Sequence, residues 1–593
     1  MKILIVGGGG REHSLAWKLS ASKKVTRLFA SPGSDAIAGC AECVALNGNT
    51  EIVEFARREK IDLTVVGPEA PLVDGLADEM AAAGLKVFGP SAAAARLEGS
   101  KVFAKEFMDR NGIPSAPFGS FDNVEDARRH LETMELPLVI KADGLAAGKG
   151  VIICHTSRQA HEALDRIMVE QAFGGAGSRV VIEGFLRGEE ASFFVITDGK
   201  DFIAFPPCQD HKPIGDLDTG PNTGGMGAYC PAPVVTPEVE RLVVEQVVRP
   251  TLQGMAAEGH PYTGVLYVGL MIHQGQPAVV EYNCRFGDPE CQPLMMMLES
   301  DLADLLLASV EGRLGEAEPR WSSGAAVCVV MASGGYPEAY AKGHIITGLE
   351  NAPQTEGLMV FHAGTRRDPG TGSWSNNGGR VLGVTARQDT LGSALEVAYN
   401  AVAGISWKDA TYRKDIGLKG MKKNRGSRPG VNVGILLGSA SDLDVAKKAT
   451  AVLEELGLGY ELAVASAHRT PERVRKFIRA CEAEGAEVFI AMAGMAAALP
   501  GVVAAETTAP VVGVPVRSTA FEGLDAMLSI AQMPPGIPVA TVAVGGGVNA
   551  ALLAAHILAL KYEDVAAALK EYRLRQAQKV EQDHAAAGLS RLI

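Results

Sequence analysis

Polar side chains alternate with apolar ones near residue 281. In the run Glu281-Tyr282-Asn283-Cys284-Arg285 every second residue is polar, and on a β-strand such residues point to the same side. A carboxylate and an amide oxygen together are the kind of ligands that hold Mg²⁺ between a protein and phosphates, and a guanidinium can clamp a carboxylate or a phosphate. The spacing therefore predicts that the side chains of Glu281 and Asn283 together bind one metal ion, and we call these two residues the metal pair. Arg285 lies beside them.

A glycine-rich loop lies between two predicted strands. Residues Lys141 to Gly150 read KADGLAAGKG, and two lysines around a flexible loop suit a lid over a nucleoside triphosphate. The loop is not a Walker motif, because only three residues separate Gly144 from Gly148 and Gly150 stands where a Ser or Thr magnesium ligand is required.

Two further polar segments follow this loop. Residues 183–190 follow the end of a strand, and their backbone groups and acidic side chains can form hydrogen bonds with the edge of an adenine and with a ribose. Residues 210–227 form a polar, glycine-dense stretch, for which a long solvated turn is the alternative interpretation.

The N-terminal glycine run, Gly7 to His13, follows a predicted strand and opens a helix. Its backbone amides can receive an anion, although a purely structural turn stays open. It fails as a nicotinamide-dinucleotide fingerprint, because Glu12 or His13 replaces the third glycine and no acid closes the next strand. An oxidoreductase is therefore disfavoured.

In the last quarter of the chain, two strand-to-helix turns carry polar groups. Residues 438–442 read GSASD, a plausible phosphate cradle, and residues 466–471 read SAHRTP. A histidine beside an arginine at a strand end, opposite a phosphate loop, favours proton transfer by His468.

The elements that position these residues are strands alternating with helices. Strands are predicted at 3–6, 63–66 and 85–89, then at 138–141 and 180–183. The fold class is α/β. The boundaries we expect are an N-terminal α/β domain at 1–100, a second domain with glycine-rich turns at 101–323, an α+β cap at 324–422, a basic linker at 423–430 and a further α/β domain at 431–593.

Ordered, rare motifs give the first part of the chain, residues 1 to about 422, a strong resemblance to phosphoribosylamine–glycine ligases of the ATP-grasp type. These motifs are GGGGREH (7–13), VVGPEAPLV (65–73), LEGSK (97–101), IKADGLAAGKGV (140–151), QDHK (209–212), DTGPNTGGMGAY (218–229) and NCRFGDPE (283–290). The resemblance implies that ATP activates glycine as an acyl phosphate, which the amine of 5-phosphoribosylamine then captures.

The resemblance also implies roles for individual residues. Mg²⁺ or Mn²⁺ is expected on Glu281 and Asn283, and Arg285 is expected to take part in catalysis. The ATP-binding residues it implies are Lys101, Lys141, Lys149, Glu183, Phe185, Leu186 and Glu190, and the residues it implies for glycine and the amine are Asp210, Gly225 and Arg285.

The last part of the chain, residues 431 to about 585, resembles N5-carboxyaminoimidazole ribonucleotide mutases, which are flavodoxin-like octamers. The motifs are the two turns above with QMPPGIP (532–538) and NAALLA (549–554). The resemblance implies that a carbamate is released as carbon dioxide and recaptured at a ring carbon, with His468 moving the proton and without metal or ATP. The substrate-binding residues implied are Ser439, Asp442, Ser466 and Arg469.

Two residues depart from the mutase pattern. Met495 and Ala498 stand where it has a glycine and a second histidine. A carboxylase that takes free carbon dioxide and a degenerate oligomerisation scaffold therefore remain alternatives. The run 532–538 favours the mutase, and the intact His468 and Arg469 argue against the scaffold.

Length and composition set the limits of this interpretation. At 593 residues, with 47% apolar and 21% charged residues, the chain has the composition of a multidomain globular protein. Its net charge of −13 disfavours nucleic-acid binding. Nine scattered cysteines and an N-terminus without an export signal indicate the cytoplasm.

Uncharged stretches at 488–505 and 526–560 raise the question of a membrane. Prolines and glycines interrupt both, which would leave backbone groups unpaired in lipid. We therefore expect no membrane span, and we expect these stretches to be buried in a homo-octamer formed by the C-terminal domain.

Overall fold

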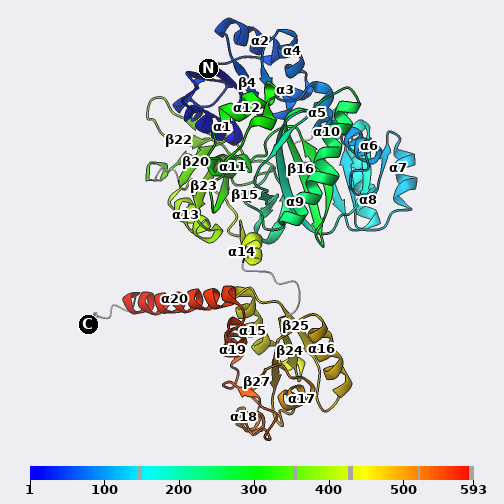
Figure 1. Cartoon of the computed structure of the whole chain (residues 1–593), viewed down its shortest axis with the longest axis vertical. Helices are drawn as coiled ribbons and strands as arrows, with labels where there is room; N and C mark the ends of the chain where they lie inside the picture. The colour runs from blue at the N-terminus through cyan, green and yellow to red at the C-terminus, as the bar shows by residue number, and fades with distance from the viewer. Residues whose placement is uncertain (145–149, 352–356, 425–431, 519–520, 587–593) are drawn as a thin grey trace. The chain divides into compact units, whose positions relative to one another are not determined.

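The computed structural model (Figure 1) divides the chain into two units, Met1–Gly420 and Met421–Ile593. It describes residues 1–144, 150–351, 357–424, 432–518 and 521–586. Within these residues no helix is both long and apolar enough to cross a membrane.

Unit 1 begins with a parallel sheet in the order β3-β2-β1-β4-β5. Residues Ile3, Leu4 and Ile5 of the central strand are fully buried. Parallel strands with such apolar residues on both faces are covered by helices on both sides. The strands are β1 (Lys2–Gly7), β2 (Arg27–Pro32), β3 (Glu42–Cys43), β4 (Leu63–Val66) and β5 (Val87–Phe88), and the helices are α1 (Gly10–Ser20), α2 (Gly48–Glu59), α3 (Glu69–Val73), α4 (Leu76–Ala82) and α5 (Ala92–Gly99). The last strand is shorter than the predicted 85–89.

Two antiparallel four-stranded sheets follow, and they supply the main walls of the site described below. The first has the order β6-β9-β7-β8, with β6 (Phe118–Phe121), β7 (Leu138–Ala142), β8 (Val151–Cys154) and β9 (Val180–Gly184). The second has the order β11-β10-β16-β17, with β10 (Glu189–Asp198), β11 (Phe202–Ala204), β16 (Thr263–His273) and β17 (Gln276–Asn283). The helices of this region are α6 (Lys101–Arg110), α7 (Val124–Leu131), α8 (Ser157–Leu164), α9 (Pro237–Val243) and α10 (Arg249–Ala257).

A further five-stranded sheet has the order β12-β15-β18-β23-β20. Its strands are β12 (Gln209–Asp210), β15 (Gly227–Cys230), β18 (Ala325–Ala332), β20 (Leu358–His362) and β23 (Arg380–Gln388). The expected cap at 324–422 thus shares its sheet with two strands from residues 209–230, because β15 pairs with β18 along four residues. This shared sheet fixes the polar segment 210–227 to the cap.

Unit 1 also contains two small sheets and four further α-helices. The small sheets are β13 (Pro213–Gly215) with β14 (Thr219–Asn222), and β19 (Ile345–Ile346), β22 (Trp374–Asn376) and β21 (Thr365–Arg367). The helices are α11 (Cys291–Met297), α12 (Leu302–Val310), α13 (Leu391–Gly404) and α14 (Leu418–Asn424), the last of which ends beyond the unit boundary.

Unit 2 is a parallel sheet in the order β25-β24-β26-β27-β28, which is the flavodoxin-like strand order 2-1-3-4-5. The predicted parallel-sheet fold is confirmed. The strands are β24 (Val433–Leu437), β25 (Tyr460–Val464), β26 (Val488–Ala493), β27 (Val511–Pro515) and β28 (Ala540–Thr541), and the helices are α15 (Leu443–Glu455), α16 (Pro471–Ala483), α17 (Leu499–Glu506), α18 (Leu524–Ala531), α19 (Gly547–Ala559) and α20 (Glu563–Ala586). The uncharged stretches form β26, α17, α18, β28 and α19, so their apolar residues largely serve the core of this unit.

Candidate functional sites

A cavity of about 460 Å³ lies in unit 1. It gathers most of the residues that the sequence singled out in this part of the chain. Those lining it are Lys101, Lys141, Glu183, Phe185, Leu186, Glu190, Asp210, Glu281, Asn283 and Arg285. Lys149 lies outside the described residues.

The metal pair predicted on β17 lies on the wall of this cavity. Glu281 and Asn283 are two residues apart on the strand, and both line the cavity. The Lys212 ammonium donates to Glu281 Oε1 over 3.2 Å. It is the main cause that lowers the pKa of Glu281 to about 2. A carboxylate held ionised beside an amide oxygen fits a hard divalent cation, which takes one or two carboxylates and leaves other positions to phosphates.

Arg285 is already neutralised by two carboxylates. Its guanidinium donates to Glu98 Oε1 at 2.8 Å and to Glu69 Oε2 at 3.2 Å. Burial alone would lower the pKa of Arg285, but Glu98 and Glu69 raise it overall. The guanidinium also donates to Asn283 Oδ1 over 3.3 Å, so it orients the amide of the predicted metal pair.

Two cavity residues, Lys141 and Glu183, belong to a buried cluster of three charged side chains. The Glu183 carboxylate contacts Lys141 Nζ at 2.5 Å and Lys105 Nζ at 2.6 Å, and all three side chains are at most 6% exposed. Because both carboxylate oxygens are engaged, Glu183 offers the cavity its main chain rather than its charge. Lys141 donates in addition to the carbonyl of Val280, which ties β7 to β17.

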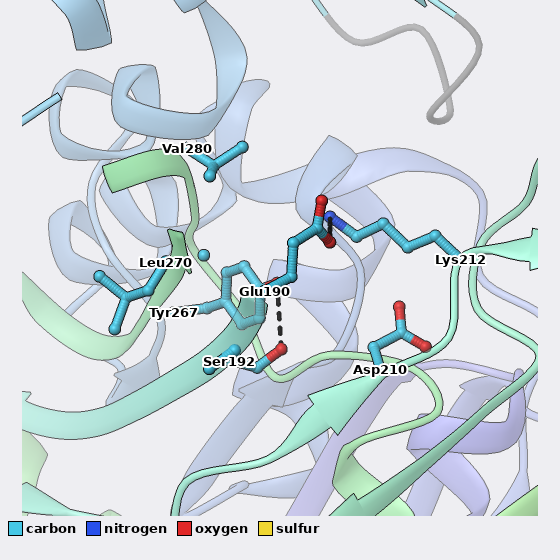
Figure 2. A pocket seen from close by; sticks show the side chains of 9 residues that line it. Glu190, Ser192, Asp210, Lys212, Tyr267, Leu270 and Val280 are labelled. Atoms are coloured by element: carbon cyan, nitrogen blue, oxygen red, sulfur yellow. Dashed lines mark hydrogen bonds and ion pairs between the residues drawn. The ribbon is translucent and has the colours of Figure 1, made fainter. Parts of the chain in front are cut away.

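Asp210 lies where the shared sheet meets the cavity, close to a small adjoining void (Figure 2). Burial, and then the Glu290 carboxylate, raise the pKa of Asp210 well above its usual range. Gly225 packs against it with φ +110°, and a Cβ there would lie 2.7 Å from Asp210 Oδ1 and 2.4 Å from Pro289 Cδ. The left-handed backbone and the lack of space both require glycine at this position.

The N-terminal glycine run makes the contacts of a structural turn. The amide of Gly9 donates to Glu12 Oε2 over 2.7 Å, so Glu12 takes one of the donors that an anion would need. His13 Nδ1 accepts from the amide of His362 over 2.8 Å, which joins the first helix to the cap. Arg11 of the same motif lines the cavity.

Several cavity residues were not predicted from the sequence. Arg380 follows an Asn-Asn-Gly-Gly run, a turn signal that gives no indication of a site. Its guanidinium donates to the carbonyls of Gly224 and Asp288, and thereby holds the polar segment against the residues after β17. Tyr336, whose hydroxyl accepts from the amide of Gly224, supports the same segment.

In unit 2 the predicted residues lie in turns at the carboxyl edge of the sheet. β24 pairs in parallel with β25, with Leu437 opposite Val464, so residues 438–442 and 465–470 leave the sheet at the same edge. β26 is the other neighbour of β24 and places residues 494–498 at that edge. The switch point of a doubly wound sheet lies between these neighbours and is where such folds bind ligands.

The first of these turns is held by its own polar groups. Asp442 is buried and accepts from the amide of Ser439 over 3.1 Å and from the hydroxyl of Ser441 over 3.1 Å. Burial raises the pKa of Asp442.

The second turn carries the predicted proton carrier. The hydroxyl of Ser466 accepts from the amide of Arg469 over 3.3 Å and from its Nε over 3.4 Å. His468 and Arg469 are exposed. The imidazole is therefore accessible at the sheet edge.

The loop after β26 contains the two departures noted in the sequence. Met495 has φ +56° and Ala497 has φ +41°, in the left-handed region where glycine is favoured. The Met495 side chain is 69% exposed. A methionine in this region stores backbone strain at the sheet edge.

Comparison with known proteins divides the chain as follows. Models of the phosphoribosylglycinamide synthetase N domain, ATP-grasp (A) domain and C domain match residues 1–98, 99–291 and 326–419, and a model of AIR carboxylase matches residues 432–579. Phosphoribosylamine–glycine ligases from Vibrio parahaemolyticus and Escherichia coli K12 are 49% and 51% identical over 430 and 431 residues, which cover 72% of this chain and 100% of each relative. The chain belongs to the phosphoribosylamine–glycine ligase family.

A solved phosphoribosylamine–glycine ligase from Thermotoga maritima agrees with this assignment. It is 34% identical, with a TM-score of 0.62, over 70% of this chain and 100% of that one. The predicted fusion of a ligase-family part with an AIR carboxylase domain is confirmed, and so is the ATP-grasp fold of the ligase part.

No cluster of three or more His, Cys, Asp or Glu side chains suited to a metal occurs among the residues that the structure describes. In the ligase-family part, Glu281 and Asn283 of β17 offer a carboxylate and an amide oxygen to the cavity, and phosphates and water would complete the shell of a divalent ion.

Proposed function

We propose that unit 1 ligates glycine to 5-phosphoribosylamine with ATP, giving glycinamide ribonucleotide. The observation that carries this proposal is the convergence of Glu281, Asn283, Lys101 and Lys141 on one cavity, in a chain that spans the whole length of relatives named for this reaction. Oxygen ligands and ammonium groups on one wall suit the charge of a triphosphate.

The roles in this site follow from what each residue offers. The main chain from Glu183 to Leu186, with Phe185 and Glu190, binds the adenosine, while Lys101, Lys141 and Lys149 neutralise the phosphates. Glu281 and Asn283 hold Mg²⁺ or Mn²⁺, which when bound offsets the charge that builds up on the transferred phosphoryl group.

The reaction needs positioning more than a protein nucleophile. The glycine carboxylate attacks the terminal phosphorus, the bond to ADP breaks, and an acyl phosphate forms. The amine of phosphoribosylamine then attacks the acyl carbon, loses a proton and displaces phosphate. Asp210 and Arg285 line the cavity where glycine and the amine would be bound, and Gly225 packs against Asp210.

The test is turnover by the full chain. ADP and glycinamide ribonucleotide should appear together, and only when ATP, glycine, phosphoribosylamine and a divalent cation are all present. Formation of ADP without any ligated product would contradict the proposal.

We further propose that unit 2 converts N5-carboxyaminoimidazole ribonucleotide into 4-carboxyaminoimidazole ribonucleotide without metal or ATP. The bond between the exocyclic nitrogen and the carboxyl carbon breaks, carbon dioxide is recaptured at ring carbon 4, and His468 moves the proton from that carbon to the nitrogen. Ser439, Ser466 and Arg469 supply donors and positive charge for the ribose phosphate, and Asp442 orders the first turn and can accept from a substrate hydroxyl. Support comes from the turns at one sheet edge in a domain matched by the AIR carboxylase model.

A direct carboxylase is the alternative for unit 2, because Ala498 and Met495 change the loop beside the histidine turn. The full chain is offered the carbamate substrate without bicarbonate and, separately, aminoimidazole ribonucleotide with bicarbonate. Conversion of the first supports the mutase, conversion of only the second supports the carboxylase, and conversion of neither supports a scaffold.

We propose that the protein is cytoplasmic and assembles as a homo-octamer through unit 2. Phe521 is 65%, Leu524 59% and Leu528 51% exposed in the single chain. Leu524 and Leu528 lie one turn apart on α18, so they share a face that a second copy would cover. A monomeric mass of the full chain in light scattering would contradict this assembly.

A further inference from the structure

The ammonium of Lys212 lies between two carboxylates that come from different strands. Its Nζ is 3.2 Å from Glu281 Oε1 and 3.6 Å from Glu190 Oε2. Lys212 lies just after β12, Glu190 near the start of β10 and Glu281 near the end of β17. Figure 2 shows the lysine side chain extended toward Glu190.

This position is part of the cavity wall rather than of the protein surface. The side chains of Lys212, Glu281 and Glu190 are 27%, 30% and 47% exposed, and all three line the cavity. Two carboxylates that face the same space repel each other unless a cation lies between them. Lys212 supplies that cation in the protein alone.

The same carboxylate is one of the proposed metal ligands. A divalent ion on Glu281 would share its carboxylate with Lys212, which now donates to one of the two oxygens, and two cations held on one carboxylate repel each other. A lysine is well suited to give up such a place, because its charge is a point on a flexible four-carbon stem.

We propose that Lys212 is an exchangeable counter-ion of the metal site, which neutralises Glu281 and Glu190 until a divalent cation arrives with the nucleotide and displaces it. The proposal rests on the assignment of Glu281 and Asn283 as the metal pair. Phosphates bring further oxygen ligands for the cation and negative charge that attracts the released ammonium. The metal alone competes poorly with Lys212, so the site takes it up with the nucleotide.

The test measures metal affinity and not turnover. Mn²⁺ is titrated into the nucleotide-free full-length protein, and the free ion is followed by its electron paramagnetic resonance signal. Lys212→Met should bind Mn²⁺ more tightly than the wild type by a factor of about ten or more, because a full positive charge next to the ligand is removed. Lys212→Arg keeps the charge and should bind as weakly as the wild type.

Lys101→Met is the matched control, because Lys101 lines the same cavity but donates to the carbonyl of Gly144 and not to Glu281. Its gain in Mn²⁺ affinity should be smaller than that of Lys212→Met, because Lys101 acts on Glu281 from a distance and does not donate to it. An equal gain in both variants would mean that only the net charge of the cavity matters, and this would overturn the proposal. An unchanged Mn²⁺ affinity in Lys212→Met would overturn it as well.

A third variant separates this proposal from the proposed function. Glu281→Gln added to Lys212→Met should abolish the gain. If the gain persists, Glu281 is not the metal ligand, and both the counter-ion role of Lys212 and the assignment of Glu281 and Asn283 as metal ligands fail, whereas the ligase activity is still judged by its own turnover test. If Lys212→Met shows no gain while Glu281→Gln in the otherwise wild-type chain loses Mn²⁺ binding in the presence of ATP, the metal pair stands and only the counter-ion role is overturned.

Discussion

The candidate sites of the two units are built in different ways. In unit 1 the site residues come from three sheets, and their charges are already paired: Glu183 with two lysines, Arg285 with two carboxylates and Glu281 with Lys212. In unit 2 the candidate residues occupy turns at one edge of one sheet, and His468 and Arg469 are exposed.

The difference matches the chemistry proposed for each unit. A site that binds a triphosphate needs several charged side chains in a wall of low dielectric constant, where an unpaired charge is costly. Its lysines and carboxylates therefore form ion pairs with one another before the substrate binds. A proton carrier needs one titratable group within reach of the substrate, and the edge of a parallel sheet supplies that position with few supporting contacts. The first kind of site depends on long-range packing, the second on a local turn.

Among the tests of this contrast, the substitution Glu281→Ala should have the largest effect on activity. Ligase turnover should fall by about 1000-fold or more, because a ligand of the cation that offsets phosphoryl charge is lost. Conversion of the unit 2 substrate by the same preparation should stay within twofold. Glu318→Ala, which removes an exposed carboxylate of unit 1, is the control and should leave both activities intact. Ligase turnover that survives in Glu281→Ala would rule out the metal pair.

The substitution His468→Asn tests the candidate site of unit 2. Conversion of the unit 2 substrate should fall by about 100-fold or more, whereas ligase activity should not change. His556→Asn removes another exposed imidazole of unit 2, on α19, and should have little effect. An unchanged rate in His468→Asn would show that the histidine does not carry the proton.

How far the sequence predicted these sites depends on the same distinction between local and long-range structure. Glu281 and Asn283 line one cavity because side chains alternate along a strand, and that alternation is visible in the sequence. The histidine turn of unit 2 is local in the same sense, since it directly follows β25 and precedes α16.

The partners of these residues were not visible in the sequence. Glu69 and Glu98, which hold Arg285, are about two hundred positions away, with separations of 216 and 187 residues. Arg380 reaches Gly224 across 156 residues, and the pairing of β15 with β18 crosses the expected domain boundary. Tertiary packing decides such contacts, and neither periodicity nor propensity reports on it.

Gly225→Ala tests how closely the unit 1 site is packed. A left-handed backbone with Pro289 Cδ 2.4 Å from the new Cβ leaves no room for a methyl group, and we expect unit 1 to lose about 3 kcal/mol of unfolding free energy. Gly259→Ala is the control, since Gly259 has φ +83° but nothing within 4 Å. It should cost only about 1 kcal/mol. Urea unfolding of the full chain measures both, and equal losses would show that crowding plays no part.

The smallest expected effect concerns acid sensitivity in unit 1. The fully buried Arg413 donates from Nε to Asp415 Oδ1 at 2.8 Å and from its NH2 group to Asp415 Oδ2 at 2.6 Å. Burial alone would raise the pKa of Asp415, but Arg413 and the amide of Leu217 lower it from 3.8 to about 2. A pKa lowered by folding means that this carboxylate stabilises unit 1 above pH 4, and that the stabilisation is lost as the pH falls toward 2.

Asp415→Asn should therefore cost about 2 kcal/mol near pH 7, and the difference from the wild type should shrink between pH 4 and pH 2. Asp444→Asn, at a side chain that is 92% exposed in unit 2, is the matched control and should leave the unfolding of unit 1 unchanged at every pH. The measurement is urea unfolding of the full chain as a function of pH. A difference that does not vary with pH would mean that Asp415 acts through its shape and hydrogen bonds alone, and the charge pairing ascribed to unit 1 would then not extend to this carboxylate.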